Sequence, residues 1–301
     1  MHTRYVFATA NVKQIMAFPA VLCLALVGCA SGPAHPAPNL IDGSITVPVP
    51  EVRPVPPRKV SRVVLPRRTE ESRYSIESVA RVERDSSGNR ESAEIRTTAL
   101  ISLTVERDSL QTRGNGVVDS FVVRGLETTG GVTSASMQPL RVPFEFAIDS
   151  NQMRVAVVPA LANVCDQPET GATTLVRDLV MRLPRDLVVG ATWTDSSAAF
   201  VCRAGVPIII RTKNSYFVDR IDGTEEQNEV FVTRTMETMV EGSSTVAWRA
   251  RSVRGSGGGT QTIRLNGKTG AIVELDGKTS LTLDVGPDRV TQQVQLTVRA
   301  L

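Results

Sequence analysis

Histidine, the side chain most often used in hydrolytic catalysis and in zinc binding, is almost missing from this chain of 301 residues. The two histidines are His2 and His35, both near the N-terminus. A folded domain built from the rest of the chain has no imidazole for a Ser-His-Asp triad or a His-ligated zinc site. No Gly-x-Ser-x-Gly motif is present either. We therefore predict no catalytic residue, no metal and no cofactor, and expect a protein that is not an enzyme.

Carboxylates are the remaining candidates for catalysis, because two acidic side chains can hydrolyse a glycosidic bond without histidine. Their spacing selects no pair, so a cell-wall glycosidase is only a minor alternative. Two Gly-Lys-Thr triplets, at 267–269 and 277–279, imitate the end of a phosphate-binding loop but lack its first glycine, and are better explained as hairpin turns. The acidic candidates are Asp149, Asp166, Asp178, Asp186, Asp195, Asp219 and Asp222.

Residues 1–28 have the organisation of a secretory leader. Arg4 and Lys13 precede an apolar run over 15–27, which is shorter than the ~20 apolar residues of a membrane-spanning helix. Small Gly28 and then Cys29 follow this run. We expect export and cleavage before Cys29; the alternative is an ordinary secreted protein with a cysteine there by chance.

The order Leu26-Val27-Gly28-Cys29 resembles the lipobox of bacterial lipoproteins, which has an aliphatic residue three before the cysteine and Gly or Ala just before it. The resemblance implies that a diacylglycerol is attached to the Cys29 sulfur and that the new amino terminus is acylated, often with palmitate. It implies a membrane-anchored envelope protein. An Asp directly after the lipidated cysteine resembles an inner-membrane retention signal. This position holds Ala30 instead, so the outer membrane facing the periplasm is preferred.

Two cysteines remain for the folded part of the chain, Cys165 and Cys202. An even number of cysteines in an oxidising compartment predicts a disulfide. On the loop-closure model such a bridge removes roughly 4 kcal/mol of unfolded-state entropy. Two free buried thiols are the plain alternative. A metal pair is disfavoured because no Cys-x-x-Cys or nearby histidine accompanies them.

Residues 29–68 are predicted to be a tether between the lipid and the domain. Nine prolines lie between Ser31 and Arg68, a density that disfavours helix and sheet and favours an extended, semi-rigid spacer. The second half of the tether is basic, which would suit acidic headgroups or cell-wall polymer, although a solvated linker is the simpler explanation. The net charge of the whole chain is only +3, and no nucleic-acid partner is expected.

Residues 69–301 are predicted to form a single β-rich domain, because apolar and polar residues alternate with a period of two. The alternation is clearest over 93–106 and over 140–148. Turn signals such as Asp222-Gly223, Glu241-Gly242, Asn266-Gly267 and Asp276-Gly277 separate the later strands. The expected strands are 74–83, 93–106, 117–123, 140–148, 153–157, 206–218, 230–239, 245–253, 260–265, 271–275, 280–285 and 290–301. We expect one large curved antiparallel sheet, a half-barrel.

One helix is predicted over 174–183, where apolar residues recur at helical spacing until Pro184 stops the run. Thr170 or Thr173 would cap its start. A helix of about three turns can cover only part of the concave face of such a sheet, so some apolar surface should stay open to a ligand. The candidate ligand-facing residues are Leu140, Val142, Phe144, Phe146, Ile148, Leu175 and Leu179. The stretch 255–259, rich in glycine, reads as a flexible connection.

The C-terminal half carries a second resemblance, through Leu183-Pro184, Gly190-Ala191-Thr192-Trp193, Tyr216-Phe217-Val218, the Gly-rich stretch and the hairpin 266–272. In this order they are similar to a group of uncharacterised bacterial envelope lipoproteins. The resemblance implies a half-barrel like that of lipoprotein-localisation carriers. The acidic position of its Gly-Asp-x-Trp motif is lost here, where Ala191 stands.

Together these patterns favour an envelope lipoprotein that acts by binding. The first hypothesis is an apolar or amphiphilic ligand, such as a lipid, on the concave face. The alternative is a scaffold that docks another envelope protein.

Overall fold

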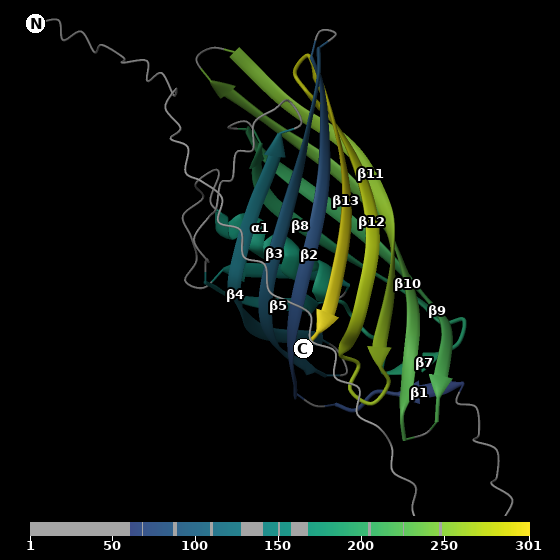
Figure 1. Ribbon diagram of the computed structural model, residues 1–301. Coiled ribbons are helices and arrows are strands. Elements are labelled where there is room, and N and C mark those ends of the chain that lie inside the picture. The colour runs from purple at the N-terminus through teal and green to yellow at the C-terminus, as the bar shows by residue number, and fades with distance from the viewer. Residues whose placement is uncertain are drawn as a thin grey trace, which may run out of the picture. The chain divides into compact units, whose positions relative to one another are not determined.

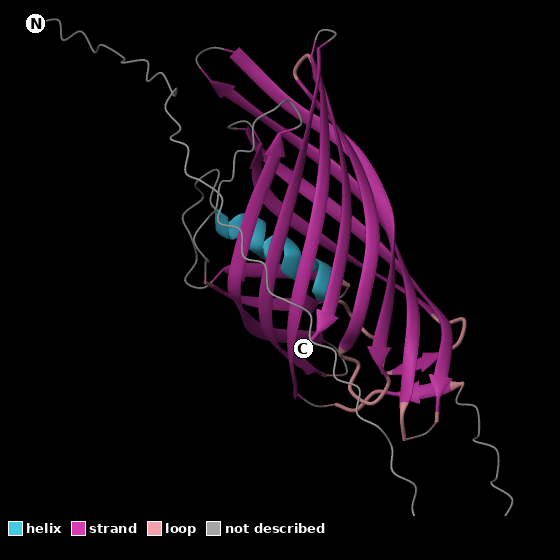
Figure 2. Cartoon of the chain, viewed as in Figure 1, coloured by secondary structure: helices cyan, strands magenta, loops and turns pink. Residues whose placement is uncertain are grey.

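The computed structural model describes residues 61–301 except for 68, 87–88, 109–110, 128–140, 150, 158–167, 204–205, 225 and 247–248. In this part of the chain eleven strands form a closed barrel, and two short strands form a separate sheet (Figure 1; Figure 2). The strand order around the barrel is β10-β11-β12-β13-β2-β3-β4-β5-β6-β8-β9. The elements are β1 (Arg62–Val64), β2 (Thr69–Ser86), β3 (Asn89–Arg107), β4 (Gln111–Glu127), β5 (Val142–Asp149), β6 (Gln152–Val157), α1 (Pro168–Leu179), β7 (Asp186–Val188), β8 (Thr192–Arg203), β9 (Val206–Gly223), β10 (Asn228–Val246), β11 (Arg249–Asn266), β12 (Ile272–Val285) and β13 (Asp288–Ala300).

The alternation that predicted the strands separates the inside of the barrel from the outside. On β2, Tyr74, Ile76 and Ala80 are buried, while Glu77 between them and Arg81 after them are exposed. The same pattern runs along the partner strands, because cross-strand partners share a face: Ile76 pairs with Ala99 on β3 and with Val298 on β13. The predicted β-rich class is confirmed.

The outer wall carries charges near both ends of the barrel, many of them in cross-strand ion pairs, such as Arg84 with Asp288 near the upper end. Arg264 bridges Glu229 and Glu274 at 3.0 and 2.9 Å, and Arg113 pairs with Glu106 at 2.8 Å. A membrane-spanning barrel has the opposite arrangement, with an apolar band facing lipid and a polar interior. This outer wall is suited to water.

The prediction of an open half-barrel is wrong, because the sheet closes on itself. The closure depends on two contacts between strands distant in sequence. The C-terminal β13 pairs with β2 from Arg289↔Asp85 to Ala300↔Tyr74, whereas β6 and β8 are parallel and share only Gln152↔Ser196 and Met153↔Ser197. The β6–β8 seam is thus much the weaker of the two.

Two features define the ends of the barrel. The lower end in Figure 1 holds the small β1–β7 sheet, and the upper end holds the C-terminal ends of β2, β10 and β12. The β1 strand lies inside the predicted tether, yet Val63 and Leu65 are buried in the core. The domain therefore begins before residue 69, and the last residues assigned to the tether dock against 185–188.

The helix α1 lies within the barrel in Figure 2, where it contacts β5, β6 and β8. It begins six residues before the predicted start and ends at Leu179, four residues earlier than expected. Residues 180–184 continue as an irregular segment whose Val180, Met181 and Leu183 are also buried. The apolar residues there are real core residues, but they follow no helical period beyond Leu179. The described helix is not long and apolar enough to cross a membrane.

Glycines inside strands allow close packing that the sequence analysis assigned to loops. The stretch 255–259 lies in the middle of β11, and Glu241-Gly242 and Asp276-Gly277 lie within β10 and β12, so three predicted connections are wrong. A Cβ at Gly257 would stand 2.1 Å from the Ser280 carbonyl oxygen of β12. Glycine is needed there for close approach of two strands. The predicted turns at 222–223 and 266–267 are confirmed.

Candidate functional site

The helix α1 has two faces, and each meets a different part of the barrel interior. Ala172, Val176 and Leu179 are 0–3% exposed and pack into the main core. Thr174, Arg177 and Asp178 follow the spacing i, i+3, i+4, which places them together on the other side of the helix. The helix therefore closes a packed lower core and presents a polar face to the rest of the interior.

A buried carboxylate on β8 gathers three hydrogen-bond donors from two other segments, β9 and the stretch after α1. Asp195 is 2% exposed; its Oδ1 accepts from Asn214 Nδ2 at 2.7 Å, and its Oδ2 accepts from the backbone N–H of Arg182 at 3.2 Å. The Tyr216 hydroxyl lies 3.0 Å from Oδ2 and donates to the same carboxylate. Burial raises the pKa of Tyr216, so its proton is retained for this bond. Asp195 thus fixes the segment after α1 to β8 and β9.

The two motifs of the C-terminal resemblance meet beside this carboxylate. Trp193 stacks on Tyr216 with ring centroids 4.9 Å apart and planes 5° from parallel. The two residues are cross-strand partners on the inner face of β8 and β9. Gly190 turns the chain into β8 with φ of +86°, and its N–H donates to Val218 O at 2.8 Å. This geometry explains why a glycine precedes the tryptophan by three residues.

A second polar group joins the helix to β10 and β11. Arg234 is 1% exposed and donates through Nη2 to Gln261 Oε1, and the same nitrogen lies 3.6 Å from Asp178 Oδ1. Gln261 in turn hydrogen-bonds Asp178. Gly277 of β12 leaves room for the Gln261 side chain, because a Cβ there would stand 2.2 Å from Gln261 Cγ. Burial raises the pKa of Asp178, although Arg234 and Arg177 oppose the shift.

Several buried donors around this cluster have no hydrogen-bond partner among the residues that the structure describes. They are Arg177 Nε and Nη1, Arg234 Nε and Trp193 Nε1. Burial lowers the pKa of Arg177 to about 10, so its guanidinium remains charged at neutral pH. Leaving buried donors unpaired costs free energy. The cluster can therefore bind a group whose oxygen atoms accept these hydrogen bonds.

Above this cluster many inward-facing side chains are only half-buried, in contrast to the core below α1, although Met236, Ala80 and Ala199 are buried. Asp178 itself keeps 34% of its side chain exposed although the barrel wall surrounds it, and Thr174 is exposed. Water therefore reaches inward-facing side chains at this level. The half-buried, inward-facing residues of the upper half combine apolar and hydroxyl groups: Val82, Ile95, Thr97, Val123, Ser197, Ile210, Thr212, Thr238, Thr279, Leu281, Gln292 and Val294.

The apolar part of this lining surrounds a second, smaller core at the upper end. Val206, Ile208, Val240, Val253 and Leu283 are buried there. Ile210 and Leu281 pack against this cluster but remain partly exposed. The upper interior therefore runs from a charged floor on α1 to an apolar region near the upper end.

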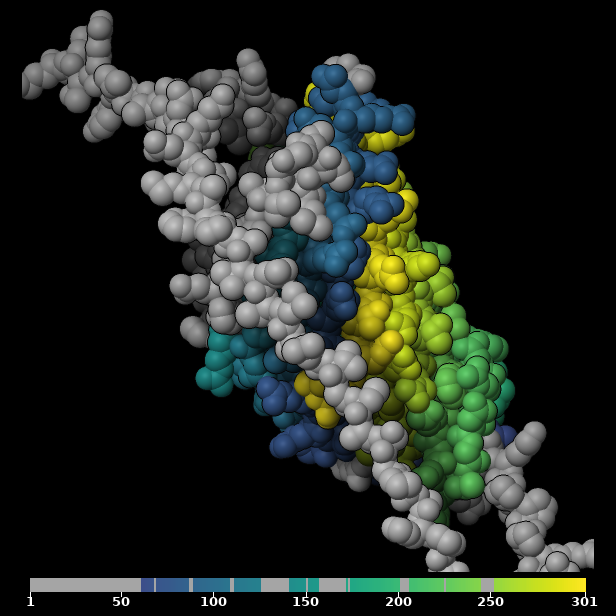
Figure 3. Space-filling model, viewed as in Figure 1, coloured from purple at the N-terminus to yellow at the C-terminus, as the bar shows by residue number. Residues whose placement is uncertain are grey.

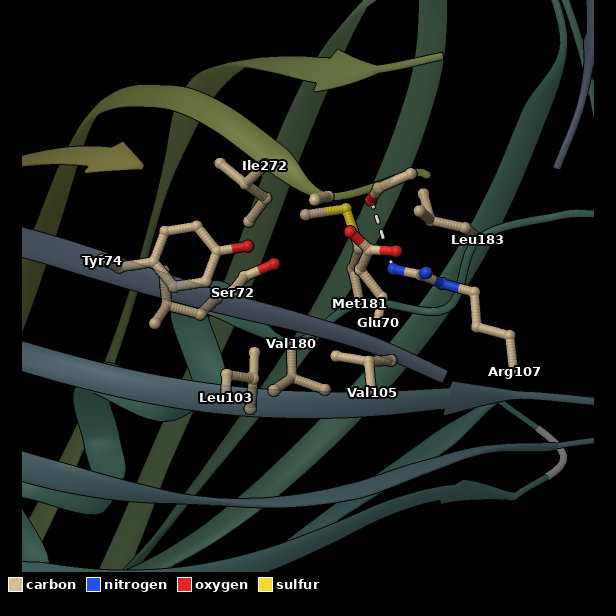
Figure 4. Close-up of a pocket in the computed structure, with 13 residues that line it drawn as sticks. Glu70, Ser72, Tyr74, Leu103, Val105, Arg107, Val180, Met181, Leu183 and Ile272 are labelled. Atoms are coloured by element: carbon tan, nitrogen blue, oxygen red, sulfur yellow. Dashed lines mark hydrogen bonds between the residues drawn. The ribbon is translucent and has the colours of Figure 1, made fainter. Parts of the chain in front are cut away.

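A small pocket lies below the helix, between the segment 179–183 and strands β2 and β3 (Figure 4). Its volume is about 20 Å³, enough for about one water molecule. Arg107 closes one side through hydrogen bonds to Thr269 O at 2.9 Å and Gly270 O at 3.2 Å. Burial raises the pKa of Tyr74, whose hydroxyl bonds Ser72 and the backbone of Ile272. This pocket is too small for a ligand and belongs to the core.

Two larger depressions lie on the outer wall. One of about 790 Å³ crosses β11, β12, β13, β2 and β3, whose outer faces form the adjoining blue and yellow surface in Figure 3. Its lining combines charged side chains, among them Arg81, Glu94 and Lys278, with apolar ones such as Val79. The other, of about 430 Å³, lies over β8 to β11 and includes Phe200, which is 71% exposed. The second carries the more unusual surface, because a large apolar side chain points to water there.

The predicted ligand-facing residues meet inside the barrel, but in its packed half. Phe144 and Phe146 fold over Gly116 and Gly114, their cross-strand partners on β4. Leu179 is 3% exposed and Leu175 is half-buried against the same core. Leu140 lies outside the described residues. Val142, Phe144, Phe146 and Ile148 are 1–4% exposed, so α1 and its neighbours cover this face and leave no room for a ligand beside it.

The remaining predicted sites depend on residues that the structure does not describe. Gly28, Cys29 and Cys165 lie outside the described residues. Cys202 is described only through its backbone in β8, where it pairs with Pro207. Lipidation and the disulfide both remain predictions.

The acidic candidates separate into wall and interior. Asp149 pairs with Arg154, Asp186 with Arg62 and Asp222 with Arg220, and Asp219 accepts from Thr233. Asp166 lies outside the described residues. Of the candidates that the structure describes, Asp178 and Asp195 lie inside the barrel, and each has the partners given above. Within the described residues no cluster of His, Cys, Asp or Glu could hold a metal ion.

Sequence reasoning missed the buried residues Asn214, Arg234 and Gln261. Their position in the strand could have revealed them. Each lies at an inward-facing position of a strand whose other inward residues are mostly apolar or small. Arg234 follows Val230 and Val232 on β10, and Gln261 precedes Ile263 on β11. A polar residue in the inward register of a strand marks a buried hydrogen-bond network.

Comparisons with known proteins assign no family to this chain. No protein-family model matches the chain, and no curated protein matches it. Among solved structures, Pseudomonas aeruginosa OpdQ is similar over 77% of this chain and 99% of its own, with 6% identity and a TM-score of 0.21. Pseudomonas aeruginosa OccK2 (OpdF) is similar over 77% of this chain and 98% of its own, with 9% identity and a TM-score of 0.23. Likeness at this level supports no inference about fold or function.

Proposed function

We propose that this chain is a membrane-anchored envelope lipoprotein that binds an amphiphilic ligand in the upper interior of its barrel. The observation that carries the proposal is the contrast across α1. Below the helix the interior is packed, and above it a polar helix face with Arg177 and Asp178 meets a half-buried lining. A charged floor and an apolar upper region suit a molecule with one polar and one apolar end.

The outer wall and the leader support the location. A wall with charges near both ends of the barrel is suited to the aqueous periplasm, and a lipid on Cys29 would hold such a domain at a membrane without embedding it. The outer membrane is the preferred site because Ala30 follows the lipidated cysteine.

The anchor is tested by Cys29→Ala, since only a thiol can take the diacylglycerol. We expect an uncleaved precursor without acyl chains, detected by mass spectrometry and by partition into detergent. Cys23→Ala, which removes a thiol within the leader, is the matched control and should be processed normally. Normal cleavage and membrane attachment of the Cys29→Ala chain would show that it is not a lipoprotein.

Ligand binding is tested by native mass spectrometry of the mature chain exported to a bacterial periplasm, with Cys29→Ala and a leader of the ordinary secretory type. We expect an added mass, lost on denaturation, that lipid analysis identifies as an amphiphile. A chain that is empty after export, and that takes up no fatty acid or lysolipid when these are added, would exclude the proposal.

A second function, docking of another envelope protein, is favoured by the apolar surface over β8 to β10. Phe200 and Met239 are 71% and 69% exposed, and Ile209 is the cross-strand partner of Phe200. If this surface binds a partner, cross-linking in cells should capture one protein reproducibly, and Phe200→Ser with Met239→Ser should lose it. Glu237→Ser on the same outer face is the control.

A further inference from the structure

The unpaired donors inside the barrel indicate what kind of headgroup the ligand carries. Arg177, Arg234 and Trp193 are linked through two shared neighbours, because Asp178 lies beside both arginines and Tyr216 contacts Arg234 and Trp193. Within the described chain four nitrogen atoms of these three residues lack an acceptor. The cluster thus has a surplus of donors.

Most acceptors of the cluster are occupied by other groups; among the described residues Asn214 Oδ1 is the exception, set against four unpaired donor nitrogens. Asp195 accepts from Asn214, Tyr216 and the Arg182 backbone, and Gln261 Oε1 accepts from Arg234 Nη2. The Asp178 carboxyl is shared between Arg234 and Gln261. A ligand that enters above α1 therefore meets buried donors that need oxygen atoms.

The geometry of the wall leaves space on this side of the cluster. Gly257 and Gly259 occupy the inward positions of β11 directly above Gln261, so β11 itself contributes no side chain to the interior there. Their neighbours across the strands, Thr238 and Thr279, are half-buried. An acyl chain can continue upward from this level toward Ile210 and Leu281.

We infer that the ligand is an anionic amphiphile, whose carboxylate or phosphate headgroup accepts hydrogen bonds from Arg177, with Arg234 as a further donor. This inference rests on the proposed function and names its ligand class. A planar guanidinium with free N–H groups binds carboxylate and phosphate oxygens in charge-assisted hydrogen bonds, which are stronger than neutral ones. A neutral headgroup would form no charge-assisted bond, and Asp178 alone would face both Arg177 and Arg234.

The test uses the exported mature chain and four probes with the same 16-carbon chain: palmitate, lysophosphatidic acid, lysophosphatidylcholine and monoacylglycerol. Calorimetric titration below the critical micelle concentration gives each dissociation constant. We expect at least one of the two purely anionic probes to bind roughly tenfold or more tightly than monoacylglycerol. The anion that binds better shows whether the site prefers carboxylate or phosphate, and lysophosphatidylcholine shows whether net charge is required.

Variants assign the preference to the site. Arg177→Gln should reduce affinity for the preferred anion roughly tenfold and leave monoacylglycerol unchanged, whereas Arg177→Lys should keep most of the preference. Arg211→Gln, which removes the same charge from the outer wall, should change neither. Thermal unfolding of each variant confirms that it is folded.

The outcomes distinguish an error in the ligand class from an error in the proposed function. Equal binding of neutral and anionic probes, unaffected by Arg177→Gln, would overturn the inference and leave the proposed function standing, with the donors satisfied by ordered water. Failure of the wild-type chain to bind any probe would overturn the proposed function itself.

Discussion

At the scale of single residues, Asp195 shows how much of this interior depends on one side chain. Its carboxylate joins β8, β9 and the segment that leaves α1, and it is 2% exposed. No local sequence pattern distinguishes it from Asp219 or Asp222, which are exposed on the wall. The distinction arises from register, because Asp195 lies two residues after Trp193 on the inward face.

Asp195→Ala should lower the free energy of unfolding by about 2–4 kcal/mol, because three donors are left without an acceptor in the core. Urea unfolding followed by circular dichroism measures the change. Asp222→Ala, at a 57% exposed side chain paired with Arg220, should change stability by less than about 0.5 kcal/mol. Equal effects of the two substitutions would show that Asp195 is not a structural centre.

Asp178 should give the barrel a measurable pH dependence. Burial raises the pKa of its carboxyl, so the native state holds a proton at pH values where the unfolded state has lost it. The stability contributed by this group is therefore greatest below about pH 4 and falls as pH rises toward the folded-state pKa. The Asp178→Asn variant should not show this decrease in stability with rising pH.

Urea unfolding of wild type and Asp178→Asn between about pH 4 and pH 7 tests this expectation. The stability of wild type relative to the variant should decrease with rising pH. Asp222→Asn serves as the exposed control and should show no such trend. A wild-type advantage that grows with pH would mean that the carboxylate is stabilised in the native state, opposite to the effect of burial.

At the scale of elements, local alternation predicted most strands, whereas glycine misled the prediction of their ends. The Gly-rich stretch 255–259 has the composition of a loop, yet it allows β11 and β12 to approach closely. Composition alone cannot separate a glycine that permits a turn from one that permits close packing. The helix ended early for a related reason: the apolar residues from Val180 to Leu183 fill the core from an irregular segment.

The pairing of Gly114 and Gly116 with two phenylalanine rings is an element-scale feature that mutation can test. A Cβ at Gly116 would stand 2.6 Å from Phe144 Cζ and 2.3 Å from Ser102 O. Gly116→Ala should therefore destabilise the fold by about 1–3 kcal/mol through overpacking. The neighbouring Asn115 is exposed, and Asn115→Ala should be nearly neutral. Thermal unfolding compares them, and equal melting temperatures would refute the packing argument.

At the scale of the whole molecule, closure of the barrel was the part that sequence could not predict. The alternating pattern shows that each strand has one buried face, but it does not show which distant strand lies beside it. Pairing of β13 with β2 joins the two ends of the described domain, and the β6–β8 seam has only two residue pairs. Both strand pairings depend on tertiary geometry. Whether the apolar face of the sheet is open or covered also depends on it.

Closure also moves the candidate ligand site. The apolar face of β5 was predicted to receive the ligand, and α1 covers it instead. What remains for a ligand is the opposite side of the helix, which was recognisable in the sequence only as the polar residues Thr174, Arg177 and Asp178. The proposed function therefore requires that a ligand occupies the upper interior of the barrel.

The most direct measurement compares one inward-facing and one outward-facing substitution on the same strand. Thr238 of β10 is half-buried and faces the interior, and Glu237 beside it is exposed on the wall. Titration with the preferred anionic probe should show that Thr238→Trp, which fills the upper interior, weakens binding at least about tenfold, whereas Glu237→Trp leaves binding unchanged. Both variants should unfold cooperatively. Undiminished binding by a folded Thr238→Trp chain would contradict the account and place the ligand outside the barrel.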